Sequence, residues 1–276
     1  MKVLVTGHLG QLGHAIQRAF TRHEVVLPAQ GEIDISDRAL LEEELERSRP
    51  DAVLNAAAYT AVDQAEAETE LAYRVNRDGA RILAEATAKR GLPLLHVSTD
   101  YVFDGEKGAP YVESDATHPL GVYGASKLAG EEEVRRVNPR HWIARTAWLY
   151  GPVGKNFALS IRAAALRGGP LRVVDDQWGS PTYAPHLALA LERLLETDAY
   201  GLHHLANGGV ASRHEFACAL LAALGSATPV EPIPTSAWPT PARRPRNTAL
   251  ATERRPAIPL PDWRAGVRAW ATALSP

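Results

Sequence analysis

The chain opens with Lys2-Val3-Leu4-Val5-Thr6-Gly7-His8-Leu9-Gly10-Gln11-Leu12-Gly13, and its architecture can be worked out from this segment. Residues 2–6 are an apolar run that predicts a strand, and the apolar spacing over residues 15–20 predicts an amphipathic helix. The glycines between them permit a tight turn, and the start of the helix offers unpaired N–H groups to an anion. Their spacing is one residue wider than the common dinucleotide fingerprint. Placed between a strand and a helix, the turn favours a dinucleotide phosphate site over a simple loop.

Strands and helices are expected to alternate along the first part of the chain. Strands are predicted at 24–27, 51–55, 94–97 and from 142, and helices at about 36–49, 66–90 and 123–137. This alternation predicts an α/β fold with a parallel sheet, whose ligands bind at the carboxyl ends of the strands, near Gly7, Ala57 and Thr99. We therefore predict a Rossmann-type doubly wound parallel sheet with a smaller C-terminal substrate-binding lobe. Residues 1–150 would mainly form the NAD(P)-binding domain and 151–276 mainly the lobe, with some segments returning to the Rossmann domain.

The residues that follow the second and third predicted strands could either contact a cofactor or have a purely structural role. A protein that binds only NAD usually ends the second strand with an acid for the ribose 2′-hydroxyl. Here the next acids are Glu32 and Asp34, and Asp34 could contact the adenine or cap the helix that begins after Ser36. The small residues 56–58 would let a flat cofactor lie against the backbone, although close helix packing would require them too.

Tyr123 and Lys127 are four residues apart in a segment predicted to be helical, so that the phenol and the ammonium share one face. A nearby ammonium lowers the pKa of a phenol from its usual value of about 10, which makes tyrosine a usable proton donor and acceptor. Thr99, at the end of the strand that begins at residue 94, could supply a second hydrogen bond to a carbonyl oxygen. An ordinary pair on a helix surface has the same spacing, so the pair alone does not establish catalysis.

Composition excludes several classes of protein. The 276 residues carry a net charge of −2, with 45% hydrophobic and 22% charged residues, which is ordinary for a globular protein and gives no reason to expect nucleic acid or a membrane surface as partner. A single cysteine excludes an intramolecular disulfide. No apolar stretch approaches the ~20 residues that span a bilayer, and the first residues lack the layout of a signal peptide. We expect a cytoplasmic protein.

The segment Pro239-Thr240-Pro241-Ala242-Arg243-Arg244-Pro245-Arg246-Asn247 sets three arginines among prolines. Guanidinium groups fixed in this way suit a diphosphate. A solvated basic loop explains the segment equally well.

Six segments together resemble the extended short-chain dehydrogenase/reductase superfamily and, within it, the dTDP-4-dehydrorhamnose reductases. The glycine turn 7–13 and the segment 123–131, which holds Tyr123 and Lys127, are superfamily-wide. A further segment is Asn55-Ala56-Ala57-Ala58-Tyr59-Thr60-Ala61-Val62-Asp63. The most specific are Ser98-Thr99-Asp100-Tyr101-Val102-Phe103-Asp104-Gly105, Arg145-Thr146-Ala147-Trp148-Leu149-Tyr150 and Pro241-Ala242-Arg243-Arg244-Pro245. The resemblance covers nearly the whole chain.

The resemblance implies reduction of the C4 keto group of dTDP-6-deoxy-L-lyxo-4-hexulose to give dTDP-L-rhamnose, with NADPH, or NADH, as the hydride donor. Tyr123 would protonate the C4 oxygen, and Thr99 would hydrogen-bond the carbonyl. Lys127 would lower the pKa of the Tyr123 phenol and hold the nicotinamide ribose. The cofactor residues it implies are Gly7, Leu9, Gly10, Gln11, Leu12, Gly13, Asp34, Ile35, Ala56, Ala57, Ala58, Tyr123 and Lys127. The substrate residues it implies are Thr60, Val62, Thr99, Tyr101, Trp148, Asn156, Arg243 and Arg244.

Two other functions are compatible with the same motifs. One is a non-catalytic regulatory subunit of a methionine adenosyltransferase, which would not require an intact set of Thr99, Tyr123 and Lys127. The other is a different sugar-nucleotide reductase or an epimerase, which would return the hydride to the same sugar. A dehydratase is disfavoured because Tyr101 stands where that class has a glutamate. Some relatives also carry a glutamate that helps to bind a divalent ion between subunits, and Ala15 stands there instead. This puts a homodimer bridged by Mg²⁺ in doubt but leaves a homodimer without the ion as an expectation, and no metal ligands are predicted.

Overall fold

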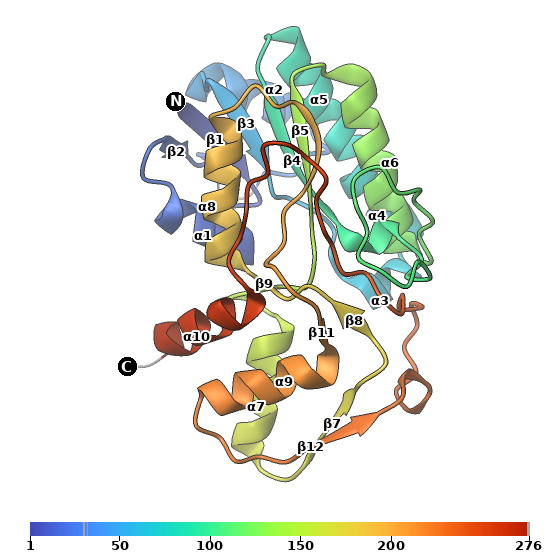
Figure 1. Ribbon diagram of the computed structural model, residues 1–276. Coiled ribbons are helices and arrows are strands. Elements are labelled where there is room, and N and C mark those ends of the chain that lie inside the picture. Colours follow the sequence, from blue (N-terminus) through green and yellow to red (C-terminus); the bar gives the residue numbers. More distant parts are fainter. Residues whose placement is uncertain (30, 32, 275–276) are drawn as a thin grey trace.

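A computed structural model describes residues 1–29, 31 and 33–274 of the chain (Figure 1), so Gln30 and Glu32 lie outside the described residues. Its centre is a six-stranded parallel sheet with the order β10-β5-β4-β3-β1-β2. The strands are β1 (Lys2–Thr6), β2 (Glu24–Val26), β3 (Ala52–Asn55), β4 (Leu94–Thr99), β5 (His141–Thr146) and β10 (Gly201–His204). This confirms the α/β fold and the parallel sheet.

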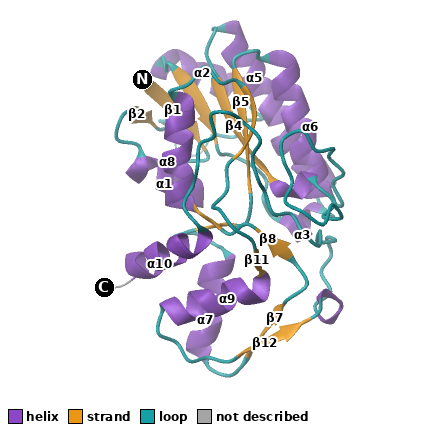
Figure 2. Ribbon diagram, in the orientation of Figure 1, coloured by secondary structure: helices purple, strands orange, loops and turns teal. Residues whose placement is uncertain are grey.

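Helices cover both faces of the sheet, as Figure 2 shows. Val3 and Val5 point to one face and pack with α1 (Gln11–Ala19) and α8 (Ala184–Leu195). Leu4, between them, points to the other face, where it packs with α2 (Arg38–Ser48), α5 (Ala80–Lys89) and α6 (Val122–Val137). Side chains of a strand alternate between faces, so a continuous apolar run is what a strand covered on both sides needs.

The strand order reverses next to β1. The chain passes from β1 to β2 on one side and then to β3 on the other. In open parallel sheets such a reversal leaves a crevice at the carboxyl ends of the strands, and this is where ligands bind. Gly7 follows β1 there with φ of +74°, and a Cβ on it would lie 2.4 Å from the carbonyl carbon of Ala56, which follows β3.

Elements from the C-terminal part of the chain complete the sheet. β10 pairs with β5, and α8 packs against α1. The other elements form the lower part of the molecule in Figure 1 around an apolar cluster that includes Tyr150, Phe216 and Trp270. They are β6 (Leu149–Tyr150), α7 (Phe157–Arg167), β7 (Leu171–Val174), β8 (Trp178–Gly179), β9 (Thr182–Tyr183), β11 (Ala211–Ser212), α9 (Arg213–Ala223), β12 (Val230–Ile233) and α10 (Trp263–Leu274).

Three predicted elements differ in detail from the structure. The helix expected at 66–90 is divided into α4 (Thr69–Tyr73), a π-helical segment (Arg74–Gly79) and α5, and it is preceded by the short α3 (Val62–Ala65). The strand from residue 142 is interrupted at Trp148, whose φ of +45° is unusual for a bulky side chain. The helix after Ser36 begins at Arg38, and Asp37 rather than Asp34 caps it by accepting from the N–H groups of residues 39 and 40.

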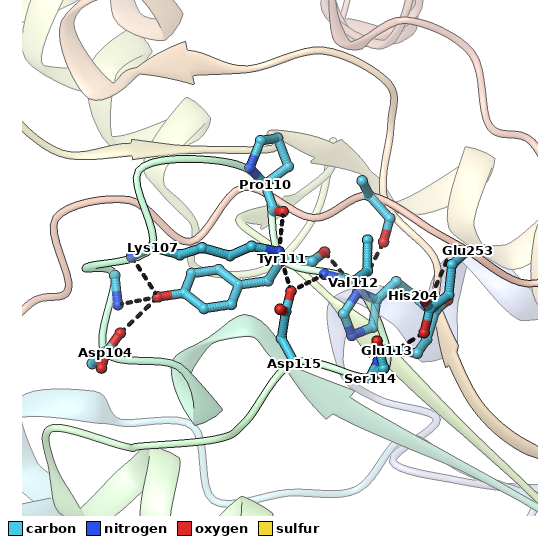
Figure 3. Close-up of polar contacts among 12 residues, drawn as sticks. Asp104, Lys107, Pro110, Tyr111, Val112, Glu113, Ser114, Asp115, His204 and Glu253 are labelled. Atoms are coloured by element: carbon cyan, nitrogen blue, oxygen red, sulfur yellow. Dashed lines mark hydrogen bonds and ion pairs between the residues drawn. The ribbon is translucent and has the colours of Figure 1, made fainter.

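The loop 104–115 fastens the C-terminal segment onto the sheet (Figure 3). The Tyr111 hydroxyl donates to Asp104 and accepts from the backbone N–H of Gly105, while the Tyr111 backbone pairs with residues 249 and 251. Glu113 accepts hydrogen bonds from the N–H of His204 in β10, from the N–H of Glu253 and from the hydroxyl of Thr252. These contacts hold residues 249–253 beside the loop 104–115 and join that loop to β10. Within the described ranges, no helix is long and apolar enough to cross a membrane.

Candidate active site

A cavity of about 590 Å³ lies along the carboxyl ends of β1, β3, β4 and β5. Most of the residues predicted for the site line it. They are Gly7, Gly10, Gln11, Leu12, Asp34, Ile35, Ala56, Ala57, Ala58, Thr60, Val62, Thr99, Tyr101, Tyr123, Lys127 and Trp148. Segments separated by more than a hundred residues therefore meet in one cavity, as the crevice of a doubly wound sheet requires.

Five predicted residues do not line the cavity. The Leu9 side chain is 60% exposed, and Arg243 is also exposed. Asn156 caps α7: its Oδ1 accepts from the N–H of Leu159, and its Nδ2 donates to backbone carbonyls, so the buried amide is occupied. The other two are Gly13 and Arg244, which have structural contacts described below.

The three glycines of the first turn have different tasks. Gly7 needs a left-handed backbone, and a Cβ on Gly13 would lie 2.4 Å from the carbonyl oxygen of Gly7, so both residues are required for close packing. Gly10 has an ordinary φ of −75°, and a Cβ on it would meet only Gly7 O, at 3.3 Å. Gly10 is the N-cap of α1 and faces the cavity, next to the N–H groups of the first helical turn. This end of the cavity fits the phosphates of a dinucleotide.

Thr99, Tyr123 and Lys127 meet at the other end of the cavity. Thr99 ends β4, and its hydroxyl accepts from the N–H of Tyr101 and donates to Asp100 at 3.1 Å. Tyr123 and Lys127 lie on the first turns of α6, and the Tyr123 ring packs edge to face on Tyr101 with a centroid distance of 5.6 Å. Lys127 Nζ donates to the carbonyl oxygen of Val97 at 2.7 Å. A threonine hydroxyl, a phenol and an amine thus converge, as the motif spacing predicted.

The pKa values of this set differ from the expectation for the pair. Burial raises the pKa of Tyr123 above its usual value, while hydrogen bonding with Thr99 acts in the opposite direction. Burial also lowers the pKa of Lys127 to about 8. The expected lowering of the phenol pKa by Lys127 is thus absent from this structure, because desolvation disfavours the charged form of both groups.

Asp100 is a site residue that the sequence analysis did not single out. Burial raises the pKa of its carboxyl to about 6, against hydrogen bonds from Thr248 and Thr99 that favour the carboxylate. Its position directly after Thr99 was the available signal. Thr248, its partner at 2.5 Å, carried no signal at all.

Arg213 was also missed. It lines the cavity at the first position of α9, with its guanidinium carbon 3.5 Å from the centroid of the Trp148 ring. Gly179 lies against the same indole, because a Cβ on it would be 2.4 Å from an atom of that ring. Burial lowers the pKa of Arg213, and Tyr101 hydrogen-bonds with it. The capping box Ser212–Glu215 marks a helix start in the sequence, but nothing there indicates a cavity.

Two contacts fix the segment between β3 and α3. Asn76, in the π-helical segment, exchanges two hydrogen bonds with the backbone of Tyr59 and donates a third to the Ser126 hydroxyl of α6. Arg244 pairs with Asp63 at 2.8 Å, which places one of the predicted arginines beside the cavity wall rather than in it. The remaining lining residues are Ile33, Val75, Val97, Ser98, Thr146, Leu149 and Lys155.

Asp34 lies at the dinucleotide end without capping α2. Its Oδ1 accepts from both the N–H and the hydroxyl of Ser36, and the Ser36 hydroxyl holds the pKa of this exposed carboxyl below its usual value. Among the residues that the structure describes, no three His, Cys, Asp or Glu side chains are grouped as a metal site would require. Ala15 is buried on α1.

Comparison with known proteins identifies the family. Residues 1–275 match the family model described as the RmlD substrate binding domain. The dTDP-4-dehydrorhamnose reductase of Burkholderia thailandensis is 41% identical over 97% of this chain and 97% of its own. That of Escherichia coli is 37% identical over 97% and 96% of the two chains.

Solved structures agree. A dTDP-4-dehydrorhamnose reductase of Clostridium acetobutylicum superposes with a TM-score of 0.95 at 35% identity, covering 99% of both chains. That of Bacillus anthracis, in complex with NADP, also has a TM-score of 0.95, at 33% identity and 99% coverage of both chains. A Thermus thermophilus UDP-glucose 4-epimerase, at 22% identity and a TM-score of 0.82, shares the fold. The chain therefore belongs to the dTDP-4-dehydrorhamnose reductase family.

Proposed function

We propose that this protein reduces the C4 keto group of dTDP-6-deoxy-L-lyxo-4-hexulose with NADPH and so produces dTDP-L-rhamnose. The observation that carries the proposal is the convergence of Thr99, Tyr123 and Lys127 in one cavity with the glycine turn. Near full-length relatives with this activity in their names support it, and one related structure contains NADP.

The cavity fits NADPH from the glycine turn to Lys127. The N–H groups of the first turn of α1 and the backbone of Gly7 and Gly10 would hold the pyrophosphate, and the small residues 56–58 would lie along the dinucleotide. When bound, the cofactor supplies a hydride. Asp34 is pinned by Ser36, and no acid closes β2, so we expect NADH to work as well, with a modest preference for NADPH.

Two side chains act at the C4 oxygen, and Lys127 supports them. The raised pKa of Tyr123 keeps its phenol protonated at neutral pH, so it can donate a hydrogen bond and then its proton to the oxygen as negative charge develops there. Thr99 would donate the second hydrogen bond, which orients the carbonyl, when its hydroxyl turns from Asp100 to the substrate. Lys127 holds the nicotinamide ribose and, while charged, favours the phenolate that remains after proton transfer.

The sugar nucleotide would lie against the opposite wall. Thr60, Val62, Tyr101 and Trp148 are proposed to contact the hexose. We assign the diphosphate to Arg213 in place of Arg243 and Arg244, because its guanidinium faces the cavity and has no ion-pair partner within the described ranges. Arg244 keeps a supporting role through Asp63. The cytoplasmic location and a homodimer stay predictions.

The direct test mixes the protein, NADPH and the dTDP-4-keto sugar and follows nicotinamide absorbance, with Tyr123→Phe as the control. We expect stoichiometric oxidation of NADPH and formation of dTDP-L-rhamnose. Tight retention of NAD with no net cofactor turnover would instead identify an epimerase. Copurification with an adenosyltransferase, without turnover, would identify a regulatory subunit.

A further inference from the structure

A line of hydrogen bonds runs from β1 across β3 and β4 to Lys127 of α6, which lines the cavity. Thr6 donates from its hydroxyl to Asn55 Oδ1 at 2.7 Å, and the backbone N–H of Ala57 donates to the same oxygen at 3.1 Å. Asn55 Nδ2 lies 3.0 Å from His96 Nδ1, and His96 Nε2 lies 3.4 Å from Lys127 Nζ. The side chains of Thr6, Asn55, His96 and Lys127 are all buried. Each of the three strands contributes one of them, and the catalytic helix contributes the lysine.

The orientation of this line follows from one backbone group. The N–H of Ala57 can only donate, so the atom that receives it must be the oxygen of the Asn55 amide. The amide nitrogen therefore points to His96 and donates to Nδ1. A neutral imidazole that accepts at Nδ1 carries its proton on Nε2. Burial and the neighbouring charge of Lys127 hold the pKa of His96 well below its usual value, which keeps the ring neutral.

The consequence falls on Lys127. The proton on His96 Nε2 points at Nζ, so a donor faces the amine. An ammonium has three N–H donors and no lone pair, and it can accept nothing from His96. A neutral amine has the lone pair that this contact needs, while it still donates to the carbonyl of Val97. The contact is therefore attractive only for the uncharged lysine.

The other titratable groups around Lys127 do not reverse the preference for the uncharged lysine. Glu131, one turn further along α6, attracts a charge on Lys127, but its carboxylate is held by two bonds from Arg145 and one from the Ser98 hydroxyl. His141 acts on His96 from β5 and opposes a positive charge there. Tyr123 shares the face of α6 with Lys127, and its phenol is neutral because burial raises its pKa.

We propose that His96 is a positioning residue for Lys127. The tautomer of His96, which is fixed by Asn55, presents an N–H donor to Lys127 Nζ and thereby favours the uncharged form of the lysine. The tautomer and the charge of Lys127 are properties of the free protein. Only the further consequence, a basic limb of the pH–rate profile that follows Lys127, rests on the proposed reductase function.

The substitution Asn55→Asp should reverse the direction of the hydrogen bonds that run through His96. A carboxylate only accepts, so His96 would place its proton on Nδ1 and turn a bare Nε2 towards Lys127, where it can accept from the ammonium. Asn138→Asp is the matched control, because Asn138 is a buried amide whose Nδ2 donates to Thr87 and Leu92 and not to His96. Nitrogen NMR of the imidazoles reports the tautomer, with His96 assigned from a His96→Gln spectrum, and a pH titration of labelled lysine side chains reports Lys127.

We expect the Nε2–H tautomer in the native protein and the Nδ1–H tautomer in Asn55→Asp. The pKa of Lys127 should rise by on the order of one unit, a tenfold change in proton affinity, in Asn55→Asp and stay unchanged in Asn138→Asp. An Nδ1–H tautomer in the native protein overturns the proposal, even if Asn55→Asp fails to fold. So does an unchanged Lys127 titration in a folded Asn55→Asp protein. Failure to reduce the dTDP-sugar would leave both NMR results standing and would count against the reductase function alone.

Discussion

The hydroxyl of Thr248 donates a hydrogen bond of 2.5 Å to Oδ2 of Asp100, a residue 148 positions earlier in the chain. Both side chains are buried. The loop 104–115 makes this contact feasible, because it fastens residues 249 and 251 to the backbone of Tyr111. A carboxylate that lines the cavity is thus held by the C-terminal segment.

Thr248→Val should destabilise the protein in a pH-dependent manner. The pKa of Asp100 is raised to about 6, so its carboxylate form predominates at pH 8 and its protonated form at pH 5. The cost of losing a bond to a carboxylate, about 1.5–3 kcal/mol, should be present at pH 8 and shrink as the pH falls through 6. Urea unfolding of both proteins at the two pH values measures this.

Thr252→Val is the matched control for Thr248→Val. Thr252 donates to Glu113, outside the cavity. Although burial opposes it, hydrogen bonds from Thr252 and from two backbone N–H groups keep the pKa of Glu113 below its usual value. The cost of this substitution should therefore be equal at pH 8 and pH 5. The same cost at both values for Thr248→Val would show that Asp100 does not titrate in this range.

Tyr123→Phe should lower kcat by on the order of 10²–10⁴ with little change in stability, because the ring remains and only the proton donor is lost. Stopped-flow or steady-state turnover of the dTDP-sugar measures it. Tyr59→Phe removes a hydroxyl that donates to Glu68, and Tyr59 does not line the cavity, so this variant should keep normal turnover. Near-normal turnover of Tyr123→Phe would exclude the phenol as the acid.

Gly10→Val should weaken NADPH binding at least about tenfold, the equivalent of ~1.4 kcal/mol, while the protein stays folded. A Cβ there would meet only Gly7 O, at 3.3 Å, and Gly10 lines the part of the cavity proposed for the pyrophosphate. Gly13→Ala is the contrasting variant. Its Cβ would lie 2.4 Å from the backbone of the turn, so this substitution should unfold the domain. Fluorescence titration with NADPH and thermal unfolding separate the two. Unchanged NADPH affinity in a folded Gly10→Val protein would exclude the phosphate cradle.

Arg213→Met should raise the KM for the dTDP-sugar by roughly ten- to a hundredfold and leave the KM for NADPH unchanged, because a charge-assisted contact to the diphosphate is lost. The free protein should not lose stability. Removing a half-buried cation from the positive end of α9 relieves a desolvation cost, which offsets the lost packing on Trp148 and the lost hydrogen bond with Tyr101.

Arg244→Met is the comparison for Arg213→Met. Arg244 is paired with Asp63, so its loss leaves that carboxylate unpaired and should loosen the segment that carries Thr60 and Val62. Both KM and stability should then change. If Arg213→Met alters the two Michaelis constants equally, Arg213 contacts the cofactor or supports the whole cavity.

The local parts of this protein could be predicted from its sequence. The apolar run 2–6, the glycine turn and the four-residue spacing of Tyr123 and Lys127 are short-range patterns, and each depends on backbone geometry within a few residues. Because parallel strands end at a common edge, the meeting of Gly7, Ala57 and Thr99 also followed from the order of elements.

Only the tertiary structure decided which distant side chains complete the site. Arg213 and Thr248 carry no local pattern that points to a cavity, and the return of β10 and α8 to the first sheet is settled by packing against β5 and α1. The tertiary structure also decided the pKa values of Tyr123 and Lys127. The sequence places an amine four residues from a phenol, but burial of both groups sets their protonation, and burial depends on every element that packs around them.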